Sequence, residues 1–295
     1  MHIPAYPVLA ALFLASCTDR GAGALRTALE ARIAETGAET VGVYFRDLRT
    51  GDSVLIDPDA RVHAASTMKV PVMIQLFRDR DAGLLRLDDS VTITKTFRSI
   101  VDGSSYDLAA PDDSDSTLYR RVGERESIRY LMERMITVSS NLATNILIEL
   151  VGADRAQATM RELGADSISV LRGVEDTKAY EAGRNNTTTA RDLGIIFGAI
   201  AEGRAASPEA CREMLAILER QEFNEGIPAG VPPDVRVGHK TGWITGIRHD
   251  GGILTLPDGG RYVLVVLTRG IQDVAAADSL ITELARLTYA FVVRR

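Results

Sequence analysis

The candidate β-strands of this 295-residue chain lie at its two ends, and a long helical region separates them. Near the N-terminus, apolar and other residues alternate at 41–46, a turn with Gly51 follows at 47–52, and 53–56 reads as the returning strand. Three segments near the C-terminus also have the composition of strands: 236–244, 249–256 and 261–268. The simplest assembly pairs the early and late strands in one antiparallel sheet.

Helical periodicity marks both ends of the chain and its middle. Leu25, Leu29 and Ile33 recur every fourth residue within 22–37, which predicts an amphipathic helix, and 274–293 has a similar pattern. Further helices are predicted in the middle of the chain, starting near Ser66 and at 127–136, 142–151, 191–203 and 208–221.

These elements together predict an α/β (α+β) fold. We expect an antiparallel five-stranded sheet flanked by helices, built from about 24–65 and 222–295. The remaining part, about 66–221, would be an inserted all-helical domain. A cleft between the two parts is the natural place for a site.

Composition excludes several classes of function. The chain carries 34 basic and 40 acidic residues, a net charge of −6, and no basic block, so it lacks the clustered charge that nucleic-acid binding needs. Neither His-x-x-x-His nor Cys-x-x-Cys occurs, so a zinc site has little support. The aspartate-rich stretch from Asp102 to Gly123 lacks the pattern of a calcium-binding loop, and we expect it to be a solvated loop. We expect no cofactor, no metal ion and no nucleic-acid partner.

Lysine is unusually scarce in this chain. Only four of the 34 basic residues are lysine, and the others are arginine. Arginine does not give up its proton at working pH, whereas lysine does so when its surroundings disfavour the charge. The four positions are therefore informative: Lys69, Lys95, Lys178 and Lys240. We expect Lys95 and Lys178 to be surface residues.

The N-terminus has the character of an export signal. Residues 3–16 carry no charge, are mostly apolar, and are too few to span a bilayer comfortably, as in the apolar region of a signal peptide. The run Leu14-Ala15-Ser16-Cys17 resembles the lipobox of bacterial lipoproteins, which implies cleavage after residue 16 and a lipid on Cys17. An uncleaved apolar N-terminus or a misassigned start is the alternative, because Met1 and His2 supply no Lys or Arg.

Export of this kind predicts an envelope or periplasmic lipoprotein that touches the membrane only through Cys17. Cys211 would then be the one remaining thiol, and no disulfide within the chain would be possible. Its helical, apolar surroundings predict a packed core thiol rather than a nucleophile. We expect the protein to be a monomer.

The first of three short motifs is Ser66-Thr67-Met68-Lys69, at the start of a predicted helix. Its spacing places the serine and the lysine one turn apart on the same helix face. A serine hydroxyl becomes a nucleophile when a neighbouring base takes its proton, and a neutral lysine is such a base. The alternative is a helix-capping serine and a solvated lysine.

The second motif, Ser139-Ser140-Asn141, falls at the break between two predicted helices. A hydroxyl and an amide at such a break can relay a proton and hold a substrate carbonyl or amide. The same residue types also cap helices very often, so this motif alone indicates only a helix boundary.

The third motif, Lys240-Thr241-Gly242, lies in a predicted strand. A lysine and a hydroxyl can bind an anionic substrate group, and the glycine allows close approach of the backbone. Read alone, the tripeptide is a strand that ends in a turn.

In this order, the three motifs resemble those of the class A β-lactamases and the wider penicillin-recognising serine enzymes. The resemblance covers about residues 24–295 and implies a β-lactamase/transpeptidase-like fold. It further implies that Ser66 is the acylated nucleophile, that Lys69 activates it, and that Ser139 helps to protonate the leaving nitrogen. Backbone N–H groups, including that of Ser66, would form the oxyanion hole.

The same resemblance implies the substrate contacts. Asn141 would contact the side-chain amide of the substrate, and Lys240 and Thr241, next to Gly242, would bind its carboxylate. Arg248, on the following strand, would assist there.

The resemblance also implies a deacylation base. A family glutamate precedes a Thr-rich turn, and Glu175, upstream of Asn186-Thr187-Thr188-Thr189, is the matching residue. A glutamate that merely forms an ion pair within the loop is the alternative.

The chain departs from the family pattern at several positions. Ser140 stands where the family most often has aspartate, Ala179 where it has the asparagine that holds the hydrolytic water, and Trp243 where it has a small or hydroxylic residue. The loop between Arg172 and Arg184 also looks shorter. These changes leave acylation intact and argue against rapid deacylation, because a carboxylate that does not orient a water is a poor base.

The resulting functional prediction is a serine hydrolase of the class A β-lactamase type, acting on a small-molecule β-lactam through an acyl-enzyme on Ser66. One alternative is a D-alanyl-D-alanine peptidase, or another envelope amidase or esterase, with the same nucleophile. Another is a lipid-anchored protein that binds penicillin or peptidoglycan ligands without turnover. Ala179 and Trp243 favour these alternatives. A generic α/β-hydrolase is disfavoured, because no Gly-x-Ser-x-Gly surrounds Ser66.

Overall fold

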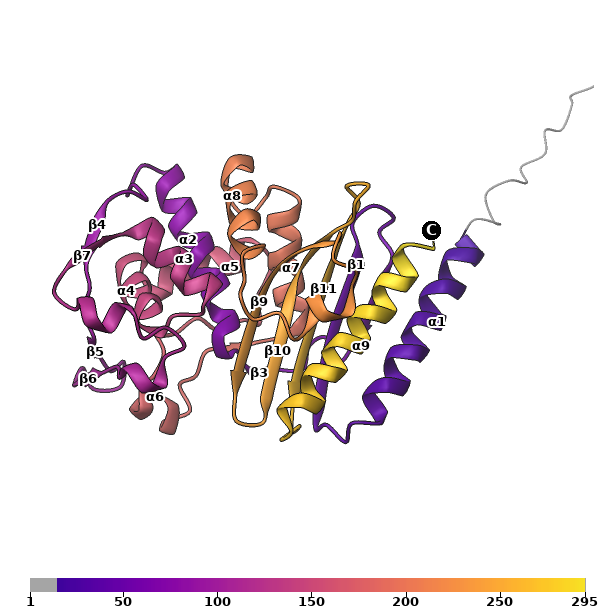
Figure 1. Ribbon diagram of the computed structural model, residues 1–295, viewed down its shortest axis with the longest axis horizontal. Helices are drawn as coiled ribbons and strands as arrows, with labels where there is room; N and C mark the ends of the chain where they lie inside the picture. The colour runs from indigo at the N-terminus through magenta and orange to yellow at the C-terminus, as the bar shows by residue number, and fades with distance from the viewer. Residues whose placement is uncertain (1–14, 295) are drawn as a thin grey trace, which may run out of the picture.

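A five-stranded antiparallel sheet forms the centre of the molecule (Figure 1). The computed structural model describes residues 15–294, with side chains from Gly21 onward. The strand order is β2-β1-β11-β10-β9, and the pairing of β1 with β11 joins the two ends of the chain, from Thr40 opposite Arg269 to Asp47 opposite Tyr262. The strands are β1 (Thr40–Asp47), β2 (Ser53–Ile56), β9 (Arg236–Ile244), β10 (Ile247–Thr255) and β11 (Arg261–Arg269). The predicted antiparallel sheet of early and late strands is confirmed.

Two different helical layers cover the faces of this sheet. Helices α1 (Ala15–Ala34) and α9 (Val274–Val292) pack side by side on one face, at the right of Figure 1. On the other face, α7 (Ala190–Ala201) contacts β1, β10 and β11. Successive side chains of β11 point to opposite faces of the sheet, and this explains both contacts. Leu264 packs in the core beneath α1 and α9, and Val265 packs in the core shared with the helical part.

The middle of the chain is mostly helical and packs around its own apolar core, at the left of Figure 1. Its α-helices are α2 (Lys69–Asp81), α3 (Ile128–Thr137), α4 (Asn141–Val151), α5 (Ala153–Glu162), α6 (Thr177–Glu181) and α8 (Pro208–Leu218). Its 3₁₀ turns are η1 (Ala65–Met68), η2 (Ala110–Asp112) and η3 (Leu118–Arg121), and η4 (Ile227–Gly230) lies near α9. Short strand pairs join β3 (Val62–His63) to β8 (Thr187–Thr188), β4 (Ser90–Thr92) to β7 (Arg125–Ser127), and β5 (Thr96–Arg98) to β6 (Ser105–Asp107).

Side chains cap several of these helices where the sequence changes from polar to apolar. Ser127 accepts a hydrogen bond from Tyr130 N at the start of α3, and Ser207 accepts one from Ala210 N at the start of α8. Such caps satisfy N–H groups that have no partner within the helix, and this explains why the helices begin where they do.

The structure differs from the sequence prediction in several places. Helices α5 and α6 and the three short strand pairs were not predicted, and α1 begins at Ala15 rather than near residue 22. The stretch from Asp102 to Gly123 is not simply a solvated loop, because Asp115 is buried and its carboxylate pairs with Arg134 (2.9 Å). A local pattern does not reveal that a polar loop is anchored by residues distant in sequence.

The predicted export signal falls mostly on residues 1–14, which lie outside the described residues. Cys17 lies in α1, and the description of that residue is limited to its backbone. Within residues 15–294, no helix is both long and apolar enough to cross a bilayer. Cys211 is buried in α8, which confirms the prediction of a core thiol.

The contact between α7 and β1 gives a prediction about stability. A Cβ at Gly194 would overlap the ring of Tyr44, whereas a Cβ at Gly198, one turn further along α7, would meet nothing within 4 Å. We expect Gly194→Ala to lower the free energy of unfolding by about 1–3 kcal/mol through overpacking. The control, Gly198→Ala, should raise it by about 0.5–1 kcal/mol through helix propensity. Urea denaturation measures both, and equal effects would contradict the packing argument.

Candidate active site

The residue predicted to be the nucleophile lies where the sheet meets the helical part. Ser66 belongs to η1, and strand β9 passes directly over this turn. A Cβ at Gly242 would lie 2.9 Å from Ser66 N and 3.1 Å from Thr67 N, so the third motif needs its glycine to approach the first. The two motifs, which start 174 positions apart in the sequence, therefore lie against each other.

Backbone strain concentrates at this site. Among the described residues, four other than glycine have a positive φ, and three of these are Ala65 (46°), Ser139 (58°) and Glu175 (61°). Each is a predicted site residue or the immediate neighbour of one. Such conformations cost free energy and persist only where the surrounding structure holds them.

Lys69 is completely buried and has a full set of hydrogen-bond acceptors. Its Nζ donates to the carbonyl of Ser139 (2.6 Å), to Ser139 Oγ (3.0 Å) and to Asn141 Oδ1 (2.8 Å). In the described part of the chain, no hydrogen bond joins Nζ to Ser66 Oγ. The first and second motifs thus meet through the lysine rather than through the serine.

Lys240 approaches the same hydroxyl from the other side. Its Nζ donates to Ser139 Oγ (3.1 Å) and to the carbonyl of Thr241 (2.9 Å), and its side chain is also fully buried. Two lysine donors therefore occupy both lone pairs of one hydroxyl oxygen, which leaves the hydroxyl proton of Ser139 free to be donated elsewhere. Beside them, Thr241 Oγ1 is buried and has no hydrogen-bond partner among the described residues.

Burial changes the protonation of these lysines. Loss of hydration lowers the pKa of Lys69 to about 7, although the negative charges of Asp113 and Glu175 oppose this. Burial, together with the nearby charge of Lys69, holds the pKa of Lys240 well below its usual range. A lysine whose pKa is about 7 is half neutral at pH 7, and so it is a competent proton acceptor.

Glu175 connects to the lysines through Asn141. Asn141 Nδ2 donates to Glu175 Oε1 (3.2 Å), while its Oδ1 accepts from Lys69. Burial raises the pKa of Glu175, and the neighbouring carboxylate of Asp112 adds to this, while Lys69 and Arg172 oppose it. The four polar side chains at 69, 139, 141 and 175 form one connected network.

The loop that carries Glu175 is held by a residue that the sequence analysis did not single out. Asn145, buried in α4, accepts from Val174 N (2.6 Å) and donates to Val174 O (3.0 Å). Tyr106, in β6, donates to the same carbonyl (3.2 Å). The available signal was an amide side chain in the apolar interior of α4, because a buried polar side chain needs a partner.

A cavity of about 340 Å³ opens beside Ser66. Of the predicted site residues, Ser66, Asn141 and Glu175 line it, and Trp243 near the end of β9 lines it as well. Its volume is that of a small organic ligand. Within residues 15–294, no cluster of three His, Cys, Asp or Glu side chains is arranged to hold a metal ion.

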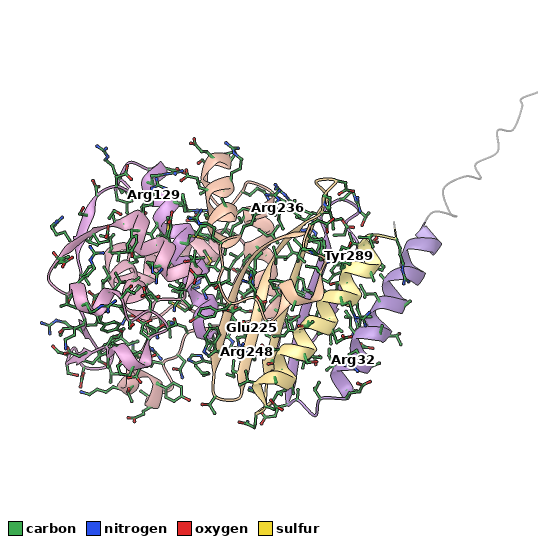
Figure 2. All side chains as sticks on the ribbon, in the orientation of Figure 1. Arg32, Arg129, Glu225, Arg236, Arg248 and Tyr289 are labelled. Carbon is green, nitrogen blue, oxygen red and sulfur yellow. The ribbon has the colours of Figure 1, made fainter. Side chains whose placement is uncertain are left out.

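Arg248, which is expected to assist at the substrate carboxylate, lies in β10 and pairs with α9. Its guanidinium forms two hydrogen bonds with Asp278 in α9 (2.6 and 2.8 Å), and Figure 2 labels it beside that helix. It also lies 4.9 Å from the ring centre of Trp243, which in turn packs edge-on against Phe223. Trp243 thus borders the cavity, and Arg248 supports it from behind.

The other departures from the family pattern have local explanations. Ser140 caps α4 by accepting from Ala143 N (3.3 Å). Ala179 is fully buried in α6, where its N–H donates to Asp176 Oδ1 (3.1 Å).

Lys95 and Lys178 form surface ion pairs with Asp107 and Asp102, as predicted for surface lysines.

Fold and site together define a serine hydrolase of the penicillin-recognising type. A sequence profile described as the β-lactamase enzyme family matches residues 24–292. A β-lactamase of Streptomyces lavendulae is 29% identical over 248 residues, 81% of this chain and 77% of that protein. The chain therefore belongs to the β-lactamase enzyme family, and it is a serine hydrolase of the class A type.

Solved structures agree with this assignment. The crystal structure of the β-lactamase from Sphaerobacter thermophilus DSM 20745 matches 93% of this chain and 98% of its own, with 31% identity and a TM-score of 0.75. A mutant of PBP-A, in an acyl-enzyme complex with penicillin G, matches 92% of this chain and 97% of its own, with 28% identity and a TM-score of 0.79.

The two hydrogen bonds between Asn145 and Val174 give a second prediction. Asn145→Ala would leave the buried N–H and C=O of Val174 without this partner, and we expect it to lower the free energy of unfolding by about 1–3 kcal/mol. The amide of Val174 should also exchange faster with solvent. As a control, Gln157→Ala removes the same kind of double hydrogen bond from Ile168 and Val170 instead. Hydrogen exchange should then rise at Val170 and not at Val174, and protection of Val174 in the Asn145 variant would contradict the assignment.

Proposed function

We propose that this protein opens the amide of β-lactams through a covalent acyl-enzyme on Ser66. The observation that carries the proposal is the pair of buried lysines that share Ser139 Oγ beside the cavity of Ser66. Burial of a lysine without a carboxylate hydrogen-bond partner is costly and is not expected for a purely structural residue. A catalytic base needs such burial, because burial lowers the pKa of the amine. The family membership supports the same reaction.

In the acylation step, neutral Lys69 takes the proton of Ser66 Oγ as that oxygen attacks the lactam carbonyl carbon. Catalytic hydrogen bonds often form only when substrate is bound, so Nζ would exchange one of its three acceptors for Ser66 Oγ. The C–N bond then breaks, and the free hydroxyl proton of Ser139 goes to the leaving nitrogen. Lys69 passes the proton that it took from Ser66 to Ser139, so both groups regain their starting protonation states when the acyl-enzyme has formed.

The substrate carboxylate would bind at Lys240 and Thr241. Thr241 Oγ1 is buried without a partner among the described residues, and an unsatisfied hydroxyl of this kind is available for a ligand oxygen. Gly242 keeps the strand close to Ser66, and Asn141 would hold the substrate amide. Arg248 would act through Trp243 and the local positive field, because its guanidinium is occupied by Asp278.

Glu175 would be the base that activates water for deacylation, in line with its raised pKa and its position at the cavity. The buried methyl group of Ala179 offers no hydrogen bond to that water. We therefore propose that deacylation is slow compared with acylation. This favours the second candidate function, a D-alanyl-D-alanine peptidase or a penicillin-binding protein with little turnover, which the likeness to the PBP-A acyl-enzyme also supports.

We further propose export by the N-terminal segment, cleavage after residue 16 and anchoring through a lipid on Cys17, so that a monomeric catalytic domain of 17–295 works in the envelope. Its sheet part would be 24–65 and 222–295, and its helical part 66–221. The apolar residues 3–16 and the lipobox-like run support this address.

A direct test follows ring opening and intact protein mass after the purified protein meets a penicillin and a cephalosporin. Fast ring opening without a lasting adduct supports the β-lactamase, and a long-lived adduct supports the peptidase or binding protein. Ser66→Ala should abolish both signals, because no other residue would be acylated. An absence of ring opening and of adduct with either compound would sink the proposal.

Glu175→Gln separates acylation from deacylation. The amide cannot accept a proton, so we expect the acyl-enzyme to accumulate, with deacylation slowed by roughly 10²–10⁴-fold and acylation changed far less. Pre-steady-state mass spectrometry measures both steps. Unchanged turnover in this variant would remove Glu175 from the mechanism and leave it as a loop residue.

The lowered pKa of Lys69 predicts the pH dependence of acylation. The neutral amine is the base, and its fraction rises with pH, so the acylation rate should rise through about pH 7 and fall about tenfold per unit below pH 6. Lys69→Arg keeps a positive charge that does not dissociate at these pH values, and it should abolish acylation at all of them. A pH-independent acylation rate between pH 5 and 8 would argue against Lys69 as the base.

A further inference from the structure

The start of helix α4 is held by two different side chains. Its first three N–H groups belong to Asn141, Leu142 and Ala143, and an α-helix cannot satisfy such groups itself. Ser140, in the middle of the second motif, accepts only from Ala143 N. The N–H groups of Asn141 and Leu142 must therefore be satisfied from elsewhere.

Asp113, which lies 28 positions earlier in the chain, satisfies both. Its Oδ1 accepts from Asn141 N (2.9 Å), and its Oδ2 accepts from Leu142 N (2.8 Å). Tyr119 in η3 also donates its O–H to Oδ2 (3.0 Å), which fixes the carboxylate in place. The next residue, Ser114, donates to the carbonyl of Val138 (2.6 Å), so this segment is fastened to both sides of the break between α3 and α4.

This contact lies one residue from the catalytic network. Asn141 is the residue whose side chain accepts from Lys69 and donates to Glu175, and its backbone N–H is the group that Asp113 holds. A carboxylate at a helix N-terminus is also favoured by the helix dipole. Of the negative groups that act on Lys69, Asp113 has the largest effect in raising the pKa of that lysine.

We infer that Asp113 is a positioning residue of this active site: it fixes Asn141 between Lys69 and Glu175, and it supplies a fixed negative charge close to the buried lysine. The second motif has no carboxylate at Ser140, and Asp113 supplies one from a loop that is distant in sequence. This inference deepens the proposed function, because it explains how the site keeps Lys69 close to half protonated.

Several charged or titratable groups face Lys69 from the elements around it. Lys240 on β9, Asp113 before η3 and Glu175 on its loop act on Lys69 directly. Asp112 acts on Glu175, Tyr119 in η3 donates to Asp113, and Asp250 on β10 acts on Lys240. Only Asp113 among them holds the backbone of α4. Its removal should therefore change both the charge at Lys69 and the placement of Asn141.

The test uses the scarcity of lysine. Protein labelled with ¹³C at the ε-carbon of lysine should give four NMR signals, which Lys95→Arg, Lys178→Arg and Lys240→Arg assign. We expect the titration midpoint of Lys69 to fall by roughly one pH unit in Asp113→Asn, because an opposing charge has been lost. The acid limb of the acylation profile should shift by the same amount, and the acylation rate constant at the optimum should fall roughly tenfold or more.

Asp115→Asn is the matched control. Asp115 is a buried carboxylate of the same loop, but it pairs with Arg134 and with Thr117 instead of the start of α4. We expect it to lower stability and to leave the Lys69 midpoint unchanged. A Lys69 midpoint in Asp113→Asn equal to that of the unchanged protein, or an equal shift in Asp115→Asn, would overturn the inference.

A second variant decides the matter if Asp113→Asn does not fold. Asp113→Glu keeps the charge but lengthens the side chain, so we expect the Lys69 midpoint to stay and acylation to fall; unchanged acylation would overturn the positioning role. The NMR titration needs no substrate. Failure of the unchanged protein to react with any β-lactam would therefore count against the proposed function alone, and an unshifted Lys69 midpoint against Asp113 alone.

Discussion

Two buried lysine amines that share one hydroxyl oxygen impose the main physical constraint on this molecule. Lys69 and Lys240 both donate to Ser139 Oγ, and neither side chain has exposed surface. Like charges at such a separation repel strongly away from water, so the site favours a state in which at least one lysine is neutral. The carbonyls of Ser139 and Thr241 and the amide of Asn141 compensate the remaining charge.

This arrangement demands accurate placement of segments that are distant in the chain. Helix α2 supplies Lys69, the break between α3 and α4 supplies Ser139, and the edge strand β9 supplies Lys240. The fold provides this placement through the close approach of Gly242 to η1 and through positive φ angles at Ala65 and Ser139. The strain stored in these residues is offset by the packing of the two apolar cores around them.

Much of the fold was predictable because its signals are local. The strands of the sheet were found within a few residues, since alternation with period two and glycine turns are visible in the sequence. Helix α5 was missed, because it buries mainly small or polar side chains such as Ala156 and Gln157 and so lacks a strong apolar stripe. The two motifs with a lysine were also visible, because each is a short run of residues that can be read in the sequence.

The supporting residues of the site were not visible in the same way. Asp113 sits in an aspartate-rich stretch that reads as a solvated loop, and its contacts with α4 arise only in three dimensions. Arg248 was placed on the correct strand, but its partner Asp278 comes from α9, 30 positions away. Asn145 gave only the weak signal of an amide side chain in the apolar interior of a helix. These residues contact partners that are distant in sequence, and a local sequence pattern does not reveal such contacts.

The pairing of β1 with β11 also has a consequence for the order in which the molecule folds. The central pair of the sheet joins residues 40–47 to 261–269, so the sheet cannot close until nearly the whole chain has emerged. The helical part, by contrast, is contiguous in sequence, so its contacts close shorter stretches of chain than the pairing of β1 with β11 does. During synthesis from the N-terminus, β1 and β2 can pair with each other, but the other edge of β1 stays without its partner until β11 has been made.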